Sequence, residues 1–230
     1  MTCSAEEQIC PALESGTPGF EYKVDTTYDY YINNWYVDMD LVCANKAHTN
    51  SMLVPYYIAS GLAGVMFLPM PDRLGRKFTI VLFLGVQLFA QYMAIFVPLY
   101  GARMAAFILY GLSQLRTMVM YIWMTEFVES RHVAAVNTSL TSFDSATMGV
   151  VCFYLLFIGR DIEKLFILMA LLASAAFLVC AFVTPESPKW LLSVRRREDA
   201  IGVLNYIAKL NGSKTRIPLN ARFKEEDQID

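Results

Sequence analysis

Five long apolar segments constrain the fold of this chain more than any other feature of its sequence. They are residues 53–70, 78–97, 104–124, 134–158 and 165–183. Each has close to the ~20 residues that a helix needs to cross a hydrocarbon core of about 30 Å. Lipid offers backbone groups no water, so each segment is expected to close its hydrogen bonds within one helix. The pattern predicts an all-α membrane protein with five transmembrane helices.

Composition supports this interpretation. Of the 230 residues, 56% are hydrophobic and only 17% are charged, and the apolar residues come in blocks. The alternative is a soluble protein in which these segments are buried helices, but that fold needs more amphipathic helices to cover them than the sequence contains. Segment 134–158 fits least well, because its first half, NTSLTSFDSATMG, is polar.

Charges divide the chain into three parts and orient it. Residues 1–52 form an acidic segment, residues 53–183 the membrane domain, and residues 184–230 a polar C-terminal part. The loops after the first, third and fifth apolar segments carry the basic residues Arg73, Arg76, Lys77, Arg131, Lys189, Arg195, Arg196 and Arg197. The positive-inside rule therefore places the N-terminus outside and the C-terminus inside. A plasma membrane and an organellar membrane, such as the mitochondrial inner membrane, both fit this pattern.

The C-terminal part contains one further helical pattern. Apolar residues from Ala200 to Leu210 recur at helical spacing and end before Gly212. They predict an amphipathic helix on the inner side, and an alternative is that this helix lies on the lipid surface with Arg195–Arg197 at the headgroups. The tail beyond residue 214 is polar and is expected to be extended.

Signals for an enzyme are weak. Two histidines, no cluster of Cys and His with metal spacing and no Walker-type loop predict no catalytic residue, no metal and no cofactor. A net charge of −2 argues against nucleic acid. Cys3, Cys10 and Cys43 lie in the outer segment, where a disulfide is possible in an oxidising compartment.

The stretch PDRLGRK interrupts the apolar pattern between the first and second segments. Asp72 near the start of the next helix suits the helix dipole, Gly75 permits a tight turn, and the three cations suit the lipid headgroups. We refer to residues 68–77 as the elbow. By these residues alone, the elbow is a charged turn that fixes topology.

With four other motifs the elbow carries a family resemblance. In order, WYVDMDLVC, PDRLGRK, TEFVESR, TPESPKWLL and AIGVLNYIAKLNG cover roughly residues 30–212. The chain resembles the organic cation/anion transporter family of the major facilitator superfamily. The resemblance implies twelve helices in two halves, of which this chain would supply helices two to six, an incomplete N-terminal half. Leu68 stands where the family has a glycine.

The resemblance also implies a site. It assigns the elbow residues, including Gly75, and three residues farther along the chain to an inner-side charged motif whose ion pairs close the cytosolic mouth. These residues are Asp72, Arg73, Arg76, Lys77, Glu126, Arg131 and Glu186. In this chain the motif serves either that gating role or only topology and packing.

Two charges lie deeper in the predicted membrane segments. Arg116 is roughly 12 Å from the inner end of its helix and Asp144 roughly 16 Å into the next, at about 1.5 Å per residue. Intramembrane charges are costly and usually pair or line a cavity. We therefore predict that Arg116 and Asp144 pair directly, either on a substrate or ion pathway or as a structural salt bridge.

Two functions follow from these expectations. The first is a structural or accessory subunit of a larger membrane complex that does not itself transport. The second is a half-transporter that moves small organic ions together with a partner carrying the missing helices. Both require a lipid bilayer and other membrane protein subunits as partners, because a half bundle leaves helix faces uncovered.

Overall fold

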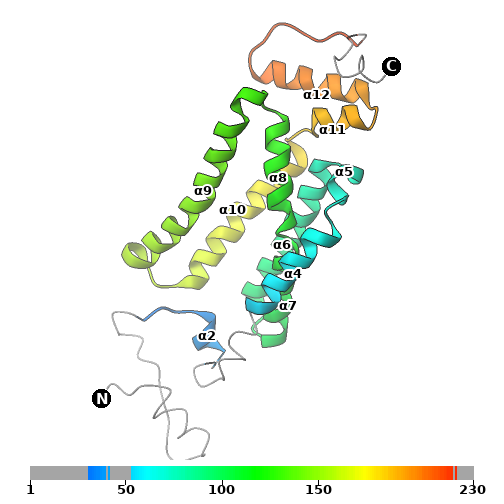
Figure 1. Cartoon of the computed structure of the whole chain (residues 1–230). Coiled ribbons are helices and arrows are strands. Elements are labelled where there is room, and N and C mark those ends of the chain that lie inside the picture. Colours follow the sequence, from blue (N-terminus) through cyan, green and yellow to red (C-terminus); the bar gives the residue numbers. More distant parts are fainter. Residues whose placement is uncertain (1–30, 40, 42–52, 220, 222–230) are drawn as a thin grey trace, which may run out of the picture.

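The computed structural model describes residues 31–39, 41, 53–219 and 221. Within them the structure is helical, with no strand beyond one isolated bridge between Asn33 and Asp161. Figure 1 shows an elongated helical bundle with α2 (Trp35–Asp38) at one end and α11 (Pro188–Ser193) and α12 (Arg197–Leu210) at the other. The predicted all-α fold is confirmed.

Four stretches are long and apolar enough to cross a membrane. They are Arg76–Phe96, Tyr100–Glu126, Ser130–Ile158 and Ile162–Phe182. The first predicted segment forms α4 (Leu53–Met66), whose 14 residues rise by roughly 21 Å and so fall short of a full hydrocarbon core. The five predicted apolar helices are therefore present as four of spanning length and one shorter helix.

Helix α6 (Arg76–Phe96) is the centre of the bundle. It packs against α7 (Tyr100–Leu112), α8 (Leu115–Glu126) and α10 (Ile162–Phe182). Its Ile80 and Phe83 form a buried cluster with Leu115, Val119 and Trp123 of α8. Side-chain packing around α6 therefore holds three other helices in register.

The predicted helix 104–124 is divided into α7 and α8. The break falls at Ser113, whose hydroxyl donates to the carbonyl of Tyr110 at 2.6 Å, while Gln114 N–H donates to the carbonyl of Gly111 at 3.1 Å. Serine side chains compete in this way with the regular helical ladder. The two helices nevertheless continue one another as a single membrane crossing.

Helix α9 (Val133–Phe153) differs from the rest of the bundle because none of its residues is buried. It is preceded by a short 3₁₀ turn, Ser130–His132, and followed by a π-helical turn, Tyr154–Ile158. In Figure 1 it stands apart from α10 along most of its length. Four of its hydroxyls are satisfied locally: Thr141 and Ser142, for example, donate to the carbonyls of Asn137 and Thr138.

The end of the bundle opposite α2 contains three short elements. Helix α5 (Met70–Leu74) lies in the elbow, and Ser187 caps α11 by accepting from Trp190 N–H at 3.2 Å. The predicted amphipathic helix is confirmed as α12, and its Ala200 packs in a cluster with Trp190 and Leu191 of α11. This apolar face is thus covered by protein, which argues against α12 lying on lipid through that face.

The contact between α4 and α7 yields a first prediction. A Cβ at Gly111 would overlap the Tyr56 carbonyl oxygen and lie 3.0 Å from Ala59 Cβ, so the backbones meet where only glycine fits. We expect Gly111→Ala to lower the free energy of unfolding by about 1–3 kcal/mol through overpacking. Reversible unfolding in mixed micelles measures this. Gly64→Ala on α4 is the control, since a Cβ there meets no atom within 4 Å; an equal loss in both variants would contradict close packing at Gly111.

Candidate functional site

The candidate site is built on the elbow between α5 and α6. Gly75 joins the two helices with φ +104° and ψ 154°, a conformation that side-chain-bearing residues rarely adopt. The turn brings Arg76 back over α5, where its Nη1 lies 2.7 Å from Asp72 Oδ1 and donates to the Pro71 carbonyl at 2.9 Å. The elbow is therefore closed on itself by one guanidinium group.

The same guanidinium group links the elbow to α8. Arg76 Nε donates to Glu126 Oε1 at 3.3 Å. The two side chains are only 14% and 13% exposed, so this ion pair is shielded from solvent, whereas Asp72 is 71% exposed. Glu126 Oε2 has no hydrogen-bond partner among the described residues. Arg76 is thus the point at which α5, α6 and α8 are held together.

Glu186 attaches the segment after α10 to the same elbow. Its Oε1 accepts from the backbone N–H of Lys77 at 3.0 Å and of Ser187 at 2.9 Å. Trp190 on α11 adds a hydrogen bond from its indole Nε1 to the Asp72 carbonyl at 2.8 Å. A carboxylate at the start of α6 also suits the positive end of that helix. We call these contacts, with the Arg76 pairs, the latch.

The structure brings together some of the residues that sequence reasoning assigned to the charged motif and leaves others apart. Asp72, Arg76, Glu126 and Glu186 meet in the latch, with Lys77 contributing its backbone rather than its ammonium group. Arg131 instead pairs with Glu129 at 2.7 Å on the exposed loop after α8. Arg73 is exposed.

Sequence reasoning missed Trp190. The motif PKWLL marks the resemblance, but only the fold shows that its indole reaches across to α5.

The direct pair predicted between Arg116 and Asp144 is not formed. No ion pair within 4.0 Å joins them, although Asp144 acts on Arg116 through a longer-range electrostatic interaction. The reason is the placement of α9: Asp144 lies on its exposed surface, whereas Arg116 lines a cavity between α6, α8 and α10. The similar depth of Arg116 and Asp144 on successive helices correctly predicted that their charges interact. It wrongly predicted that they form a direct ion pair.

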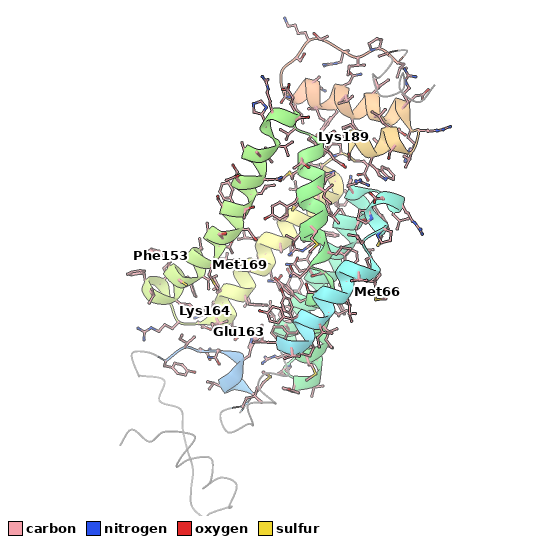
Figure 2. All side chains as sticks on the ribbon, in the orientation of Figure 1. Met66, Phe153, Glu163, Lys164, Met169 and Lys189 are labelled. Atoms are coloured by element: carbon pink, nitrogen blue, oxygen red, sulfur yellow. The ribbon has the colours of Figure 1, made fainter. Side chains whose placement is uncertain are left out.

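The end of the bundle near α2 has its own polar contacts, which the sequence did not indicate. Asn33 N–H donates to the Arg160 carbonyl at 2.9 Å, the Ile162 N–H donates to the Asn33 carbonyl at 3.1 Å, and the Asn33 amide donates to Asp161 Oδ1 at 3.3 Å. Lys164 Nζ lies 3.0 Å from Asp161 Oδ2. In Figure 2 Lys164 and Glu163 lie at the end of the bundle opposite Lys189. The segment around residue 33 is thereby tied to the start of α10.

An aromatic contact also links this N-terminal segment to the helices. Trp35 packs edge-on against Phe107 of α7 and Phe166 of α10, with ring centroids 5.9 and 4.7 Å apart. The guanidinium carbon of Arg103 lies 5.4 Å from the Trp35 ring centroid, a cation–π distance. Trp35 therefore joins α7 and α10 at the end of the bundle near α2.

The contacts between Asn33 and Asp161 are expected to depend on pH. The hydrogen bond from Lys164, and to a smaller extent that from Asn33, hold the pKa of Asp161 below its ordinary value. The stabilisation is present above the unfolded aspartate pKa of about 3.9 and is lost as pH falls through the lower folded value. The exchange protection factor of the Ile162 amide should hold from pH 7 to 5 and fall below about pH 4. Lys164→Gln should move the fall to higher pH; an unchanged midpoint would contradict this cause.

Other candidate chemistry is sparse in the described part of the chain. There, no group of three or more His, Cys, Asp and Glu side chains is placed to hold a metal ion. Cys3, Cys10 and Cys43, the residues of the possible outer disulfide, lie outside the described residues. Cys152 and Cys180 are free.

Known proteins similar to this chain are transporters. The mouse (Mus musculus) organic cation/carnitine transporter 2 is 25% identical over 209 residues, which is 86% of this chain and 35% of that protein. The resemblance to the organic cation transporters is confirmed. Solute carrier family 22 member 16 of Bos taurus is 26% identical over 92% of this chain and 35% of its own length, and the Drosophila melanogaster carcinine transporter is 26% identical over 92% and 30%.

These matches describe the chain as a multi-pass membrane protein similar to organic cation transporters, which are not enzymes. The chain spans about a third of the length of these curated relatives. No protein-family model matches it.

Proposed function

We propose that this chain supplies the inner-gate helices of a transporter for small organic cations or zwitterions. The observation that carries the proposal is the shielded ion pair of Arg76 with Glu126 inside the latch. A latch that joins α5, α6, α8 and α11 holds the inner ends of these helices as one body. Alternating-access transport requires such a body to rock against a second one around a midplane site. The chain acts in this proposal together with further membrane helices.

The proposal includes an orientation. The latch and α12 lie at one end of the bundle and the Asn33–Asp161 contact at the other. The basic residues around the latch support a cytosolic position for that end and an outside position for α2. Single cysteines at Ser193 and Arg160 in a cysteine-free chain test this: a membrane-impermeant maleimide on intact cells should label the Arg160→Cys variant and spare Ser193→Cys. The reverse labelling would contradict the orientation.

Substrate uptake tests the transport activity. The relatives' names make carnitine and carcinine the first probes. Cells expressing the chain together with the partner that carries the remaining helices should accumulate one of them faster than cells expressing that partner alone, and Glu126→Gln should reduce the rate because it removes the charge that holds Arg76 while preserving shape. Glu129→Gln is the matched control, since Glu129 lies three residues along the chain in an exposed ion pair.

The composition of the native particle that contains this chain is a second test of the same proposal. Gentle solubilisation of the natural membrane should yield a particle that contains the remaining transporter helices. A particle with no such helices, or no uptake by correctly inserted chain within that particle, would contradict transport.

The structural or accessory subunit is the second candidate function. Leu68, at the position where the resemblance implies a glycine, is 62% exposed beside the elbow. A leucine there is an obstacle to a second body approaching the latch closely, and a fixed subunit interface tolerates it better than a moving gate does. If the chain is such a subunit, it should be found in a large native complex with an unrelated activity. Leu68→Gly should leave that activity unchanged.

A further inference from the structure

The inference concerns a small cavity inside the bundle and is independent of the latch. The cavity has a volume of about 180 Å³ and lies between α6, α8 and α10. Six of its lining residues are apolar or weakly polar: Ile80, Leu84, Met120, Ala173, Ala176 and Cys180. The other two, Gln87 and Arg116, are polar. The wall is therefore apolar except at one place.

Both polar side chains have an atom without a partner. Gln87 is only 6% exposed, and its Oε1 has no hydrogen-bond partner among the described residues. The Nε of Arg116 is likewise shielded and unpartnered. Buried polar atoms are almost always satisfied, so two unsatisfied atoms on side chains that line one cavity mark the polar part of its wall.

Depth makes the unpartnered Nε of Arg116 significant. Gln87 lies eleven residues from the start of α6 and Arg116 ten from the end of α8, which places both roughly 15 Å from the inner end of the bundle. That depth is near the middle of a hydrocarbon core of about 30 Å. A guanidinium group there requires a counter-charge. Asp144 is not within ion-pair distance, and it lies on the exposed helix α9 outside the cavity wall.

The glutamine can add a second donor. Its Nε2 now donates to Tyr110 Oη at 3.5 Å, a long contact. Amide oxygen and nitrogen have the same shape, so in the reversed orientation Tyr110 donates to Oε1 and the amide N–H groups face the cavity. Arg116 and Gln87 then present converging N–H donors, an arrangement that suits a carboxylate, whose two oxygens match the planar guanidinium group.

We propose that this cavity binds a small monocarboxylate with a short apolar tail. The carboxylate accepts from Arg116 and Gln87, and the tail lies along the apolar wall toward Ile80 and Cys180. The bound anion neutralises Arg116, and in the reversed amide orientation Tyr110 satisfies Gln87 Oε1. The volume is sufficient for an acid of a few carbons.

Equilibrium binding of radiolabelled butyrate to the natural chain, in lipid nanodiscs and chloride-free sulfate buffer, tests the proposal. We expect one saturable site. Arg116→Gln should weaken binding at least about tenfold, the effect of losing charge-assisted hydrogen bonds. Ala176→Leu should also abolish binding by filling the cavity while both polar groups remain, and it keeps the test decisive if Arg116→Gln does not fold.

Gln91→Leu is the matched control for Gln87→Leu. Gln91 lies one turn farther along α6, is 4% exposed and also has an unpartnered Oε1, but it does not line this cavity. Only Gln87→Leu should weaken butyrate binding. Equal effects of the two variants would overturn the site.

Three further results would overturn the proposal. Displacement of butyrate by chloride at equal concentration would show a simple halide site in place of a carboxylate site. Binding of butyrate only in the Asp144→Asn variant would show that Asp144 is the counter-ion of Arg116 in the natural protein. Absence of any saturable butyrate binding would mean that water alone fills the cavity.

Discussion

Arg76→Leu is expected to lower the free energy of unfolding by about 3–5 kcal/mol, the usual cost of removing one partner of a buried ion pair. The change would leave Glu126, only 13% exposed, without its cation, and its other oxygen already has no partner among the described residues. It would also remove the donor to the Pro71 carbonyl. Reversible unfolding in mixed micelles, followed by circular dichroism, measures the loss.

The double variant Arg76→Leu with Glu126→Leu tests whether the loss of stability comes from the unpaired carboxylate. Because most of the cost is the stranded carboxylate, removing both charges should restore a large part of the lost stability. Arg73→Leu is the control on the same short stretch, since Arg73 is exposed. Additive losses in the double variant would contradict a coupled pair.

Gly75→Val is expected to cost about 3 kcal/mol or more. A valine must adopt φ near +104°, a strained region that costs about 1–3 kcal/mol. Its Cβ would also overlap Glu186 Oε2 and lie 3.3 Å from Trp190 Cη2. Displacing Glu186 breaks its bonds to the Lys77 and Ser187 N–H groups, so one backbone donor at the start of α6 and one before α11 lose their acceptor.

Two measurements distinguish this effect from general damage. Unfolding gives the total loss, and limited proteolysis between α10 and α11 should become faster as Glu186 leaves the elbow. Gly202→Ala in α12 is the control: no atom lies within 4 Å of its Cβ, and alanine favours a helix interior. Unchanged proteolysis in Gly75→Val would show that the elbow tolerates a side chain and that Glu186 is not held by the glycine turn.

Helix existence was predictable because it depends on local composition. Apolar length predicted the membrane helices, and spacing of apolar residues predicted α12. The break at Ser113 was not predictable, because Ser and Gln are tolerated in membrane helices and only the hydrogen bond to Tyr110 reveals the bend. The length of α4 was also overestimated. Apolar residues continue through Pro69 and Pro71 into the elbow, where proline ends the helix.

The sequence predicted which residues belong to the candidate site better than it predicted which of them contact one another. Asp72, Arg76, Glu126 and Glu186 were identified from motifs, and they meet. Arg131 was assigned to the same network and pairs locally with Glu129 instead, because a long side chain on an exposed loop takes the nearest carboxylate. The deep pair of Arg116 and Asp144 fails for a different reason, since sequence gives the depth of a residue along its helix but not the direction in which its side chain points.

The sequence by itself therefore determined that this chain is a multi-pass helical membrane protein with a charged elbow, since these properties depend on the length, hydropathy and order of short segments. Only the tertiary structure decided which charges meet, that Trp190 closes the elbow, that α9 stays uncovered and that Arg116 faces a cavity. These outcomes depend on the rotation and tilt of whole helices, which are set by packing between residues far apart in the chain.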